Sequence, residues 1–198
     1  MQDPNVELLH WRNVQRLVQT VYKLPLPVTD VTETPTSPDD VIKQVLNVVI
    51  FASSPSTAAS AINDALETRD LGLQQKLLLG VLLHFVENSG VTTFSRVLQN
   101  DSLYTPASNR LKECRRAFYD LRVVHGAIIL QDQNLDSYAL VSYKTVLAPA
   151  ILQIAQNNDV TVAKIADTLY LNPAFRKVSL TYIKRAVTML VSEKLLVL

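Results

Sequence analysis

The stretch PSTAASAINDALETRDLGLQQKLLLG, residues 55–80, predicts two consecutive helices with a short break at Arg69-Asp70. Apolar residues in the first helix recur at the i, i+3, i+4, i+7 and i+8 spacing of one buried face: Ala58, Ala61, Ile62, Ala65 and Leu66. Asp70 is expected to cap the second helix, and Gly90 is expected to end it because glycine tolerates a left-handed exit. Two helices joined so closely are expected to pack antiparallel.

A serine followed by a proline predicts the start of two helices, at Ser37-Pro38 and at Ser54-Pro55. Asp39 and Asp40 then lie in the first turn, where the helix dipole favours negative charge. Four more helices are predicted. The first starts at Thr105-Pro106, with Leu111, Cys114, Phe118, Leu121 and His125 on its inner face. The second runs from Asp136 or Ser137 through Asn157, and Pro149 is expected to kink it or split it in two. The last two cover Val162–Tyr170 and Leu180–Lys194, with Ser179 as the cap of the latter. The strand candidates are residues 123–130 and the terminal KLLVL, so the predicted fold class is all-α, built of irregular antiparallel helical hairpins.

The region before Ser37 is expected to be a tethered element. Residues 5–23 carry an apolar stripe at helical spacing: Val6, Leu9, Val14, Leu17, Val18 and Val21. Residues 25–38 contain four prolines among Thr, Asp and Glu, which favours an extended linker. The predicted organisation is therefore an N-terminal helix over 1–24, a linker over 25–38 and a helical body over 39–198, with a sub-boundary near 158–160.

The composition indicates an apolar chain without a strong overall charge. Hydrophobic residues make up 48% and charged residues 19%, against about 25% charged in an average soluble protein. The excess apolar surface is expected to be covered inside the body or by a partner. The net charge is +1, so any basic site must be local. The chain has a single cysteine, which favours a reducing compartment. Its longest apolar run, Leu77–Val86, is about half of a ~20-residue membrane span. We therefore expect a soluble intracellular protein, cytoplasmic or nuclear, with no membrane partner.

No arrangement of reactive side chains predicts an enzyme, a metal site or a cofactor. The three histidines, His10, His84 and His125, stand alone in the sequence. We expect His84 to be a hydrogen-bonded core histidine and Cys114 to be an inert thiol on an apolar helix face. No two of the four glycines are closer than eight residues, which argues against a phosphate-cradling loop.

Two local basic features remain. In NRLKECRRAFYDLR, the side chains of Lys112, Arg115, Arg116 and Arg122 are expected to project away from the apolar face, with Tyr119 nearby. Such a surface can bind phosphates or an acidic peptide, and the alternative is an ordinary solvated helix face.

The second feature is the C-terminal helix pair, which resembles a winged-helix module. In that alternative Thr181, Lys184, Arg185 and Thr188 would face a DNA major groove, with Arg176 and Lys177 on phosphates. The connection between the helices is longer than a helix-turn-helix turn and lacks glycine. The other interpretation is a final helical hairpin that caps a scaffold.

The stretch ASSPSTAASAINDALETRDLGLQQKLLLGVLLHFVENSG, residues 52–90, resembles the conserved domain of the telomere length regulation protein family. The matching positions are Ala52, Pro55, Asp70, Leu73, Gln75, Lys76 and Gly90. Residues 116–122, 140–159 and 176–198 resemble later segments of that family more faintly. The resemblance implies a HEAT-type helical scaffold, a subunit of a three-part co-chaperone that supports maturation of phosphatidylinositol-3-kinase-related kinases. It implies as partners those kinases and the fellow co-chaperone subunits.

Polar residues at the break between the first two helices are candidates for the rim of such an interface. They are Arg69, Gln74, Gln75 and Lys76. For each of them the alternative is an ordinary solvated helix start.

Overall fold

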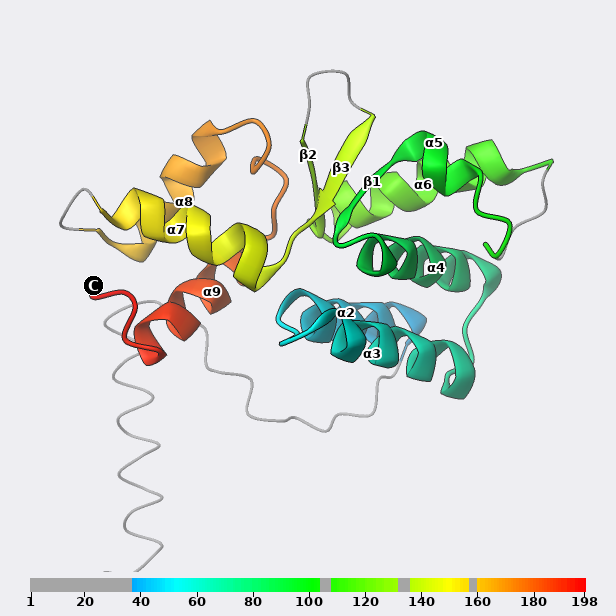
Figure 1. Cartoon of the computed structure of the whole chain (residues 1–198), viewed down its shortest axis with the longest axis horizontal. Helices are drawn as coiled ribbons and strands as arrows, with labels where there is room; N and C mark the ends of the chain where they lie inside the picture. Colours follow the sequence, from blue (N-terminus) through cyan, green and yellow to red (C-terminus); the bar gives the residue numbers. More distant parts are fainter. Residues whose placement is uncertain (1–36, 104–107, 132–135, 157–159) are drawn as a thin grey trace, which may run out of the picture.

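The computed structural model describes residues 37–103, 108–131, 136–156 and 160–198, so the predicted helix over 5–23 and most of the linker over 25–38 lie outside it. The described chain is mostly helical, with one small sheet (Figure 1). In order, the elements are α2 Pro38–Ile50, α3 Pro55–Thr68, α4 Leu73–Glu87, β1 Val91–Thr93, α5 Phe94–Leu98, α6 Arg110–Tyr119, the π-helical turn η1 Asp120–Val124, β2 Ile128–Leu130, β3 Ser137–Leu140, the π-helical turn η2 Tyr143–Leu147, α7 Ala148–Ala155, α8 Val162–Leu171 and α9 Leu180–Ser192. None of the helices in these ranges has the length and apolar character to cross a bilayer.

The predicted serine caps of the first two helices are confirmed. The hydroxyl oxygen of Ser37 accepts from the backbone N–H of Asp40 at 3.2 Å, and that of Ser54 accepts from Thr57 at 3.2 Å. Ser179 stands at the N-cap of α9, but its side chain makes no capping hydrogen bond. These starts are set by bonds between residues three apart, so the local sequence predicts them.

The prediction that Asp70 caps the next helix is wrong. Gly72 is the N-cap of α4, and it provides no side-chain hydrogen bond. The chain leaves α3 in an extended conformation at Arg69, and Leu71 is buried before α4 begins. The insertion of Leu71 into the core therefore delays the helix start. At the other end of α4, Gly90 has a φ of +81° as expected, and its N–H donates to the carbonyl of Phe85 at 2.7 Å.

The sheet corrects the prediction of a helix that starts at Asp136 or Ser137. Residues 137–140 form β3, the central strand of an antiparallel sheet with order β1-β3-β2. Ala139 pairs with Val91 on one side and with Ile129 on the other. The strand forms because partners distant in sequence satisfy its backbone groups, and no local pattern reports such pairing. The helical segment begins later, at Tyr143, and it is divided into the π-helical turn η2 and α7, with Pro149 in the first turn of α7.

Of the two strand candidates, the first contains β2 and the second is wrong. Lys194 adopts a left-handed conformation with a φ of +59°. The N–H groups of Leu195 and Leu196 then both donate to the carbonyl of Leu190, at 2.9 and 3.2 Å. The terminal residues therefore close the end of α9, with Leu196 buried, and do not add a strand.

Helices α2–α6 lie at one end of the molecule and α7–α9 at the other, with the strands between them (Figure 1). One apolar core extends through both ends, from Ile42 in α2 to Leu190 in α9. On the side of α2–α6, Phe118 packs edge-on against Phe94 and Tyr138, with ring centroids 5.1 and 4.9 Å apart. The expectation of a mainly helical body is confirmed, with a small sheet that the sequence did not predict as such.

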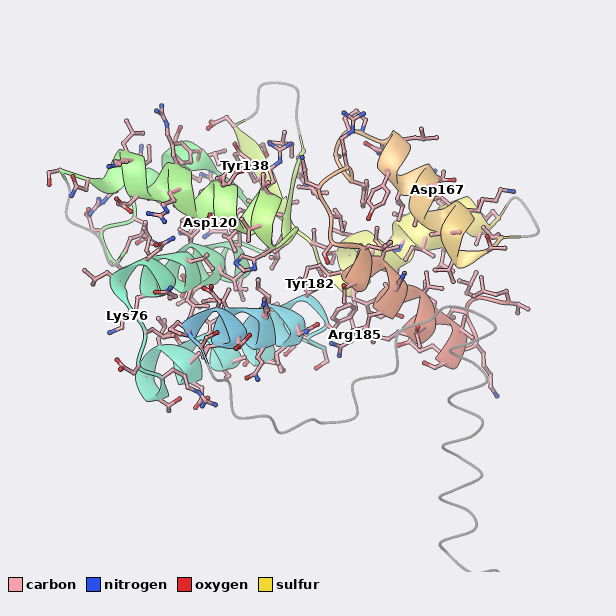
Figure 2. The ribbon with its side chains drawn as sticks, turned by 180° about the vertical axis from the view of Figure 1, so that it is seen from behind. Lys76, Asp120, Tyr138, Asp167, Tyr182 and Arg185 are labelled. Carbon is pink, nitrogen blue, oxygen red and sulfur yellow. The ribbon has the colours of Figure 1, made fainter. Side chains whose placement is uncertain are left out.

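Side-chain contacts join the two ends. Arg185 in α9 donates to the side-chain oxygen of Asn47 in α2 at 3.0 Å. Its guanidinium carbon also lies 4.2 Å from the centroid of the Phe51 ring. Figure 2 shows Tyr182 and Arg185 on the side of α9 that faces α2. The side chain of Tyr182 is buried there, and this burial raises its pKa to about 12. The ammonium group of Lys144 donates to the carbonyl of Ser53 at 3.0 Å. Within the α7–α9 end, the hydroxyl of Tyr143 donates to the carboxylate of Glu193 at 2.7 Å.

Candidate functional site

A pocket of about 320 Å³ opens between α6, η1 and β3. Its lining includes two arginines and four aromatic side chains: Arg115, Arg122, Phe94, Phe118, Tyr119 and Tyr138. We call it the Arg115/Arg122 pocket. It combines two cationic groups with an aromatic floor, a pairing that suits planar acidic groups.

The helix spacing explains why these side chains meet. Arg115, Tyr119 and Arg122 follow one another at i, i+4 and i+7, so they lie along one face. Phe118 lies next to this face and is buried, where it contacts Phe94 and Tyr138 and lines the same pocket. The floor is therefore fixed by aromatic packing, while the arginines stand at the surface.

The two arginines have no carboxylate partner among the residues that the structure describes. The ion pairs found there are Lys43–Asp40 and Arg110–Asp101. Arg115 is exposed and Arg122 is half-buried. A guanidinium that no internal carboxylate neutralises can offer its forked donors to an incoming carboxylate or phosphate.

The other predicted basic residues of α6 lie outside this pocket. Lys112 and Arg116 are exposed on the helix, as expected. The expectation that Leu111 faces inward is wrong, since it is 48% exposed. Arg110 is turned inward in its place, and its guanidinium donates to Asp101 at 3.0 Å and to the carbonyl of Leu98 at 3.3 Å.

Of the four candidates at the break before α4, one makes a contact inside the protein. The side-chain amide of Gln74 donates to the carboxylate of Asp120 at 3.2 Å and so ties α4 to η1. Arg69 is exposed, whereas Gln75 and Lys76 are half-buried. None of these four side chains lines the Arg115/Arg122 pocket.

Two of the candidates for DNA contact make hydrogen bonds within the protein. The prediction that Arg185 faces a DNA groove is wrong, because its guanidinium is engaged by Asn47 and Phe51 inside the protein. The hydroxyl of Thr188 donates to the backbone carbonyl of Lys184 at 3.0 Å. Thr181 is exposed on α9, and Arg176 and Lys177 are exposed in the segment before it. The contacts of Arg185 with Asn47 and Phe51 thus remove one of the four groove contacts of the winged-helix interpretation.

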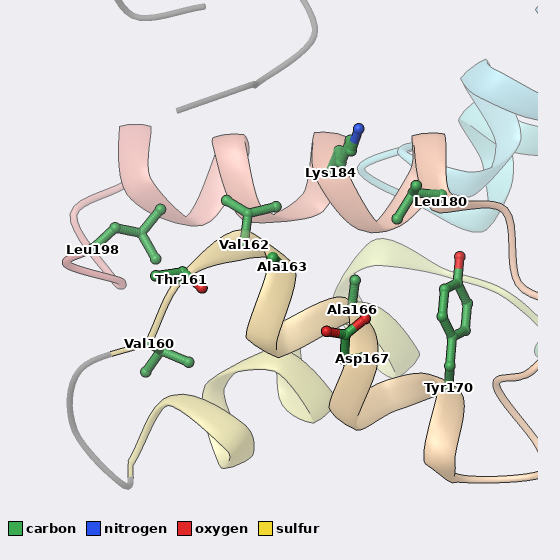
Figure 3. A pocket seen from close by; sticks show the side chains of 10 residues that line it. All are labelled: Val160, Thr161, Val162, Ala163, Ala166, Asp167, Tyr170, Leu180, Lys184 and Leu198. Carbon is green, nitrogen blue, oxygen red and sulfur yellow. The ribbon is translucent and has the colours of Figure 1, made fainter. Parts of the chain in front are cut away.

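A second hollow, which the sequence did not indicate, lies between α8 and α9 (Figure 3). It measures about 570 Å³ and is lined mainly by apolar side chains: Val162, Ala163, Ala166, Tyr170, Leu180 and Leu198. We call it the α8–α9 groove. The terminal Leu198 reaches the groove because the chain turns back after α9. The local sequence did not predict this turn.

The isolated titratable groups behave as expected for structural residues. Asn100 donates to Nδ1 of His84 at 3.3 Å, which leaves Nε2 to donate to the hydroxyl of Thr92 at 3.0 Å. Desolvation lowers the pKa of His84, which favours this neutral form. Burial raises the pKa of the Cys114 thiol, in keeping with an unreactive side chain. The expectation of a hydrogen-bonded histidine is confirmed, although its side chain is only half-buried.

Comparisons with protein-family models, curated proteins and solved structures find no match to this chain. The resemblance to the telomere length regulation family therefore stays a hypothesis that rests on the residues of the 52–90 stretch.

Proposed function

We propose that this chain is a non-catalytic binding scaffold that holds an acidic segment of a partner protein at the Arg115/Arg122 pocket. One observation carries the proposal: two arginines without a carboxylate partner in the described structure border a pocket with an aromatic floor. The rest of the helical body positions that pocket.

The size and chemistry of the pocket suit a peptide contact. Its volume of about 320 Å³ is at the lower end of the range for ligand pockets, which is room for one or two side chains. An Asp or Glu of the partner would accept from the guanidinium groups of Arg115 and Arg122. An apolar or aromatic neighbour in the same peptide would pack on Phe94 and Tyr138.

The family resemblance suggests which proteins supply that segment. We propose large helical partners, namely phosphatidylinositol-3-kinase-related kinases and the subunits of their co-chaperone. In this proposal α2, α3 and α4 form an irregular HEAT-like stack, whose outer ridges extend the interface beyond the pocket.

The proposal is tested with two double variants of the full chain. Arg115→Ala/Arg122→Ala removes both cations from the pocket, whereas Lys112→Ala/Arg116→Ala removes the same charge from the exposed face of the same helix. We expect the first variant to bind a fluorescein-labelled Glu-rich peptide with one Phe about tenfold or more weakly, because charge-assisted hydrogen bonds are lost. The second variant should bind within about twofold of the wild type.

Affinity capture from the native cell with the same variants identifies the partner. The expected result is recovery of the kinases or co-chaperone subunits with the wild type and the Lys112/Arg116 variant, and their loss with the Arg115/Arg122 variant. Equal recovery with both variants contradicts a role for the pocket. Recovery that disappears after nuclease treatment contradicts the protein-binding proposal and favours nucleic-acid binding.

A further inference from the structure

The α8–α9 groove presents apolar side chains that nothing in the described chain covers. Leu180 is 39% exposed and Leu198 is 38% exposed. In Figure 3 the groove runs between the two helices, with Tyr170 at one end and Leu198 at the other. Lys184 on α9 and Asp167 on α8 stand beside this apolar surface. A groove of this form suits an amphipathic helix.

We propose that the α8–α9 groove is the docking site of the N-terminal segment of the same chain, residues 5–23. The sequence predicts a helix there, and its apolar stripe has no partner within the segment itself. Docking would cover the stripe and the groove together. This inference is independent of the Arg115/Arg122 pocket.

The length of chain before α2 allows this contact. Residues 25–36 extend over at most roughly 40 Å, at ~3.5 Å per residue. The radius of gyration expected for a body of this size is roughly 15 Å, so the extended tether is more than twice as long as that radius. Because both elements belong to one chain, the segment is held near the groove at an effective concentration on the order of millimolar.

The charges of the two surfaces are also complementary. At about 100° per residue, Glu7 falls between Val14 and Val18 near one edge of the stripe, and Arg16 lies just outside the opposite edge, beside Leu9. The groove offers a cation on its α9 side, Lys184, and an anion on its α8 side, Asp167. A helix seated in one direction therefore places Glu7 toward the lysine and Arg16 toward the aspartate.

The single tryptophan of the chain, Trp11, reports on this docking. It is seven residues before Val18 and so shares its helix face, at the edge of the stripe. In the full-length protein we expect blue-shifted Trp11 emission and protection from acrylamide quenching.

Leu198→Asp places a carboxylate in the groove. It should lower the ratio of docked to undocked segment by about 100-fold, because an unpaired charge is costly in apolar surroundings.

The matched control is Val197→Asp, which adds the same charge one residue away. Val197 is 88% exposed and does not line the groove. Ala163→Glu, on an exposed groove position of α8, provides a second disruption that does not involve the terminus. Both groove variants should turn Trp11 to a red-shifted, quenchable state, whereas Val197→Asp should match the wild type. Circular dichroism at 222 nm checks that the body of each variant remains folded.

Three results would overturn the inference. Quenching of Trp11 in the wild type as strong as that of free tryptophan would leave the groove to a partner protein. Equal shielding of Trp11 in the wild type and in both groove variants would place the segment elsewhere. Shielding that rises with protein concentration, with a doubled mass in size-exclusion chromatography, would assign the groove to the segment of a second copy.

Discussion

At the scale of single residues, Gly126 holds a position between η1 and β2 that other residues cannot take without strain. Its φ is +59°, and a Cβ there would meet the backbone nitrogen of Ser179 and lie 2.6 Å from the carbonyl oxygen of Lys177. We predict that Gly126→Ala lowers the free energy of unfolding by roughly 2–4 kcal/mol, from left-handed strain and a backbone clash. Gly72→Ala is the control, since its Cβ would meet only the flexible side chain of Gln75 and should cost about 1 kcal/mol or less. Urea denaturation followed by circular dichroism measures the stability of both variants. Equal urea midpoints for Gly126→Ala and Gly72→Ala would contradict the prediction.

At the scale of elements, α9 is attached to α2 through Arg185. Arg185→Met keeps an unbranched apolar stem but loses the hydrogen bond to Asn47 and the cation over Phe51. We predict a loss of roughly 1–3 kcal/mol in the free energy of unfolding. Lys177→Met, at an exposed position before α9, should stay within about 0.5 kcal/mol of the wild type. If the two variants have the same midpoint of thermal denaturation, Arg185 is not a structural link between these helices.

At the scale of the whole molecule, the shared core predicts that α2–α6 and α7–α9 unfold together. The apolar cluster is continuous through both ends, and the Arg185–Asn47 hydrogen bond and the bond from Lys144 to the carbonyl of Ser53 cross the junction. Helix loss, measured by circular dichroism at 222 nm, and loss of tyrosine packing, measured in the near ultraviolet, should coincide in one transition. Two separated transitions in a calorimetric scan would show that the ends are independent domains.

The sequence by itself determined the features that depend on neighbours along the chain. The starts of α2 and α3 follow from a serine oxygen that caps an N–H three residues later, and the spans of α8 and α9 follow from apolar spacing. The sequence also placed Arg115 and Arg122 on an outward helix face. In each case the interacting residues lie within one or two helical turns of each other. A short stretch of sequence therefore contains both partners.

The tertiary structure alone decided the features whose partners are far apart in sequence. Residues 137–140 became a strand because they pair with residues 91–93 and 128–130. The aromatic floor of the Arg115/Arg122 pocket needs Phe94 and Tyr138, which no window around α6 contains. Arg185 carries the same charge as Lys184 beside it, yet its position on the α2 side of α9 makes it an internal contact. A local sequence pattern indicates whether a segment prefers helix or strand. Its burial and its strand pairing depend on the distant part of the chain that it packs against.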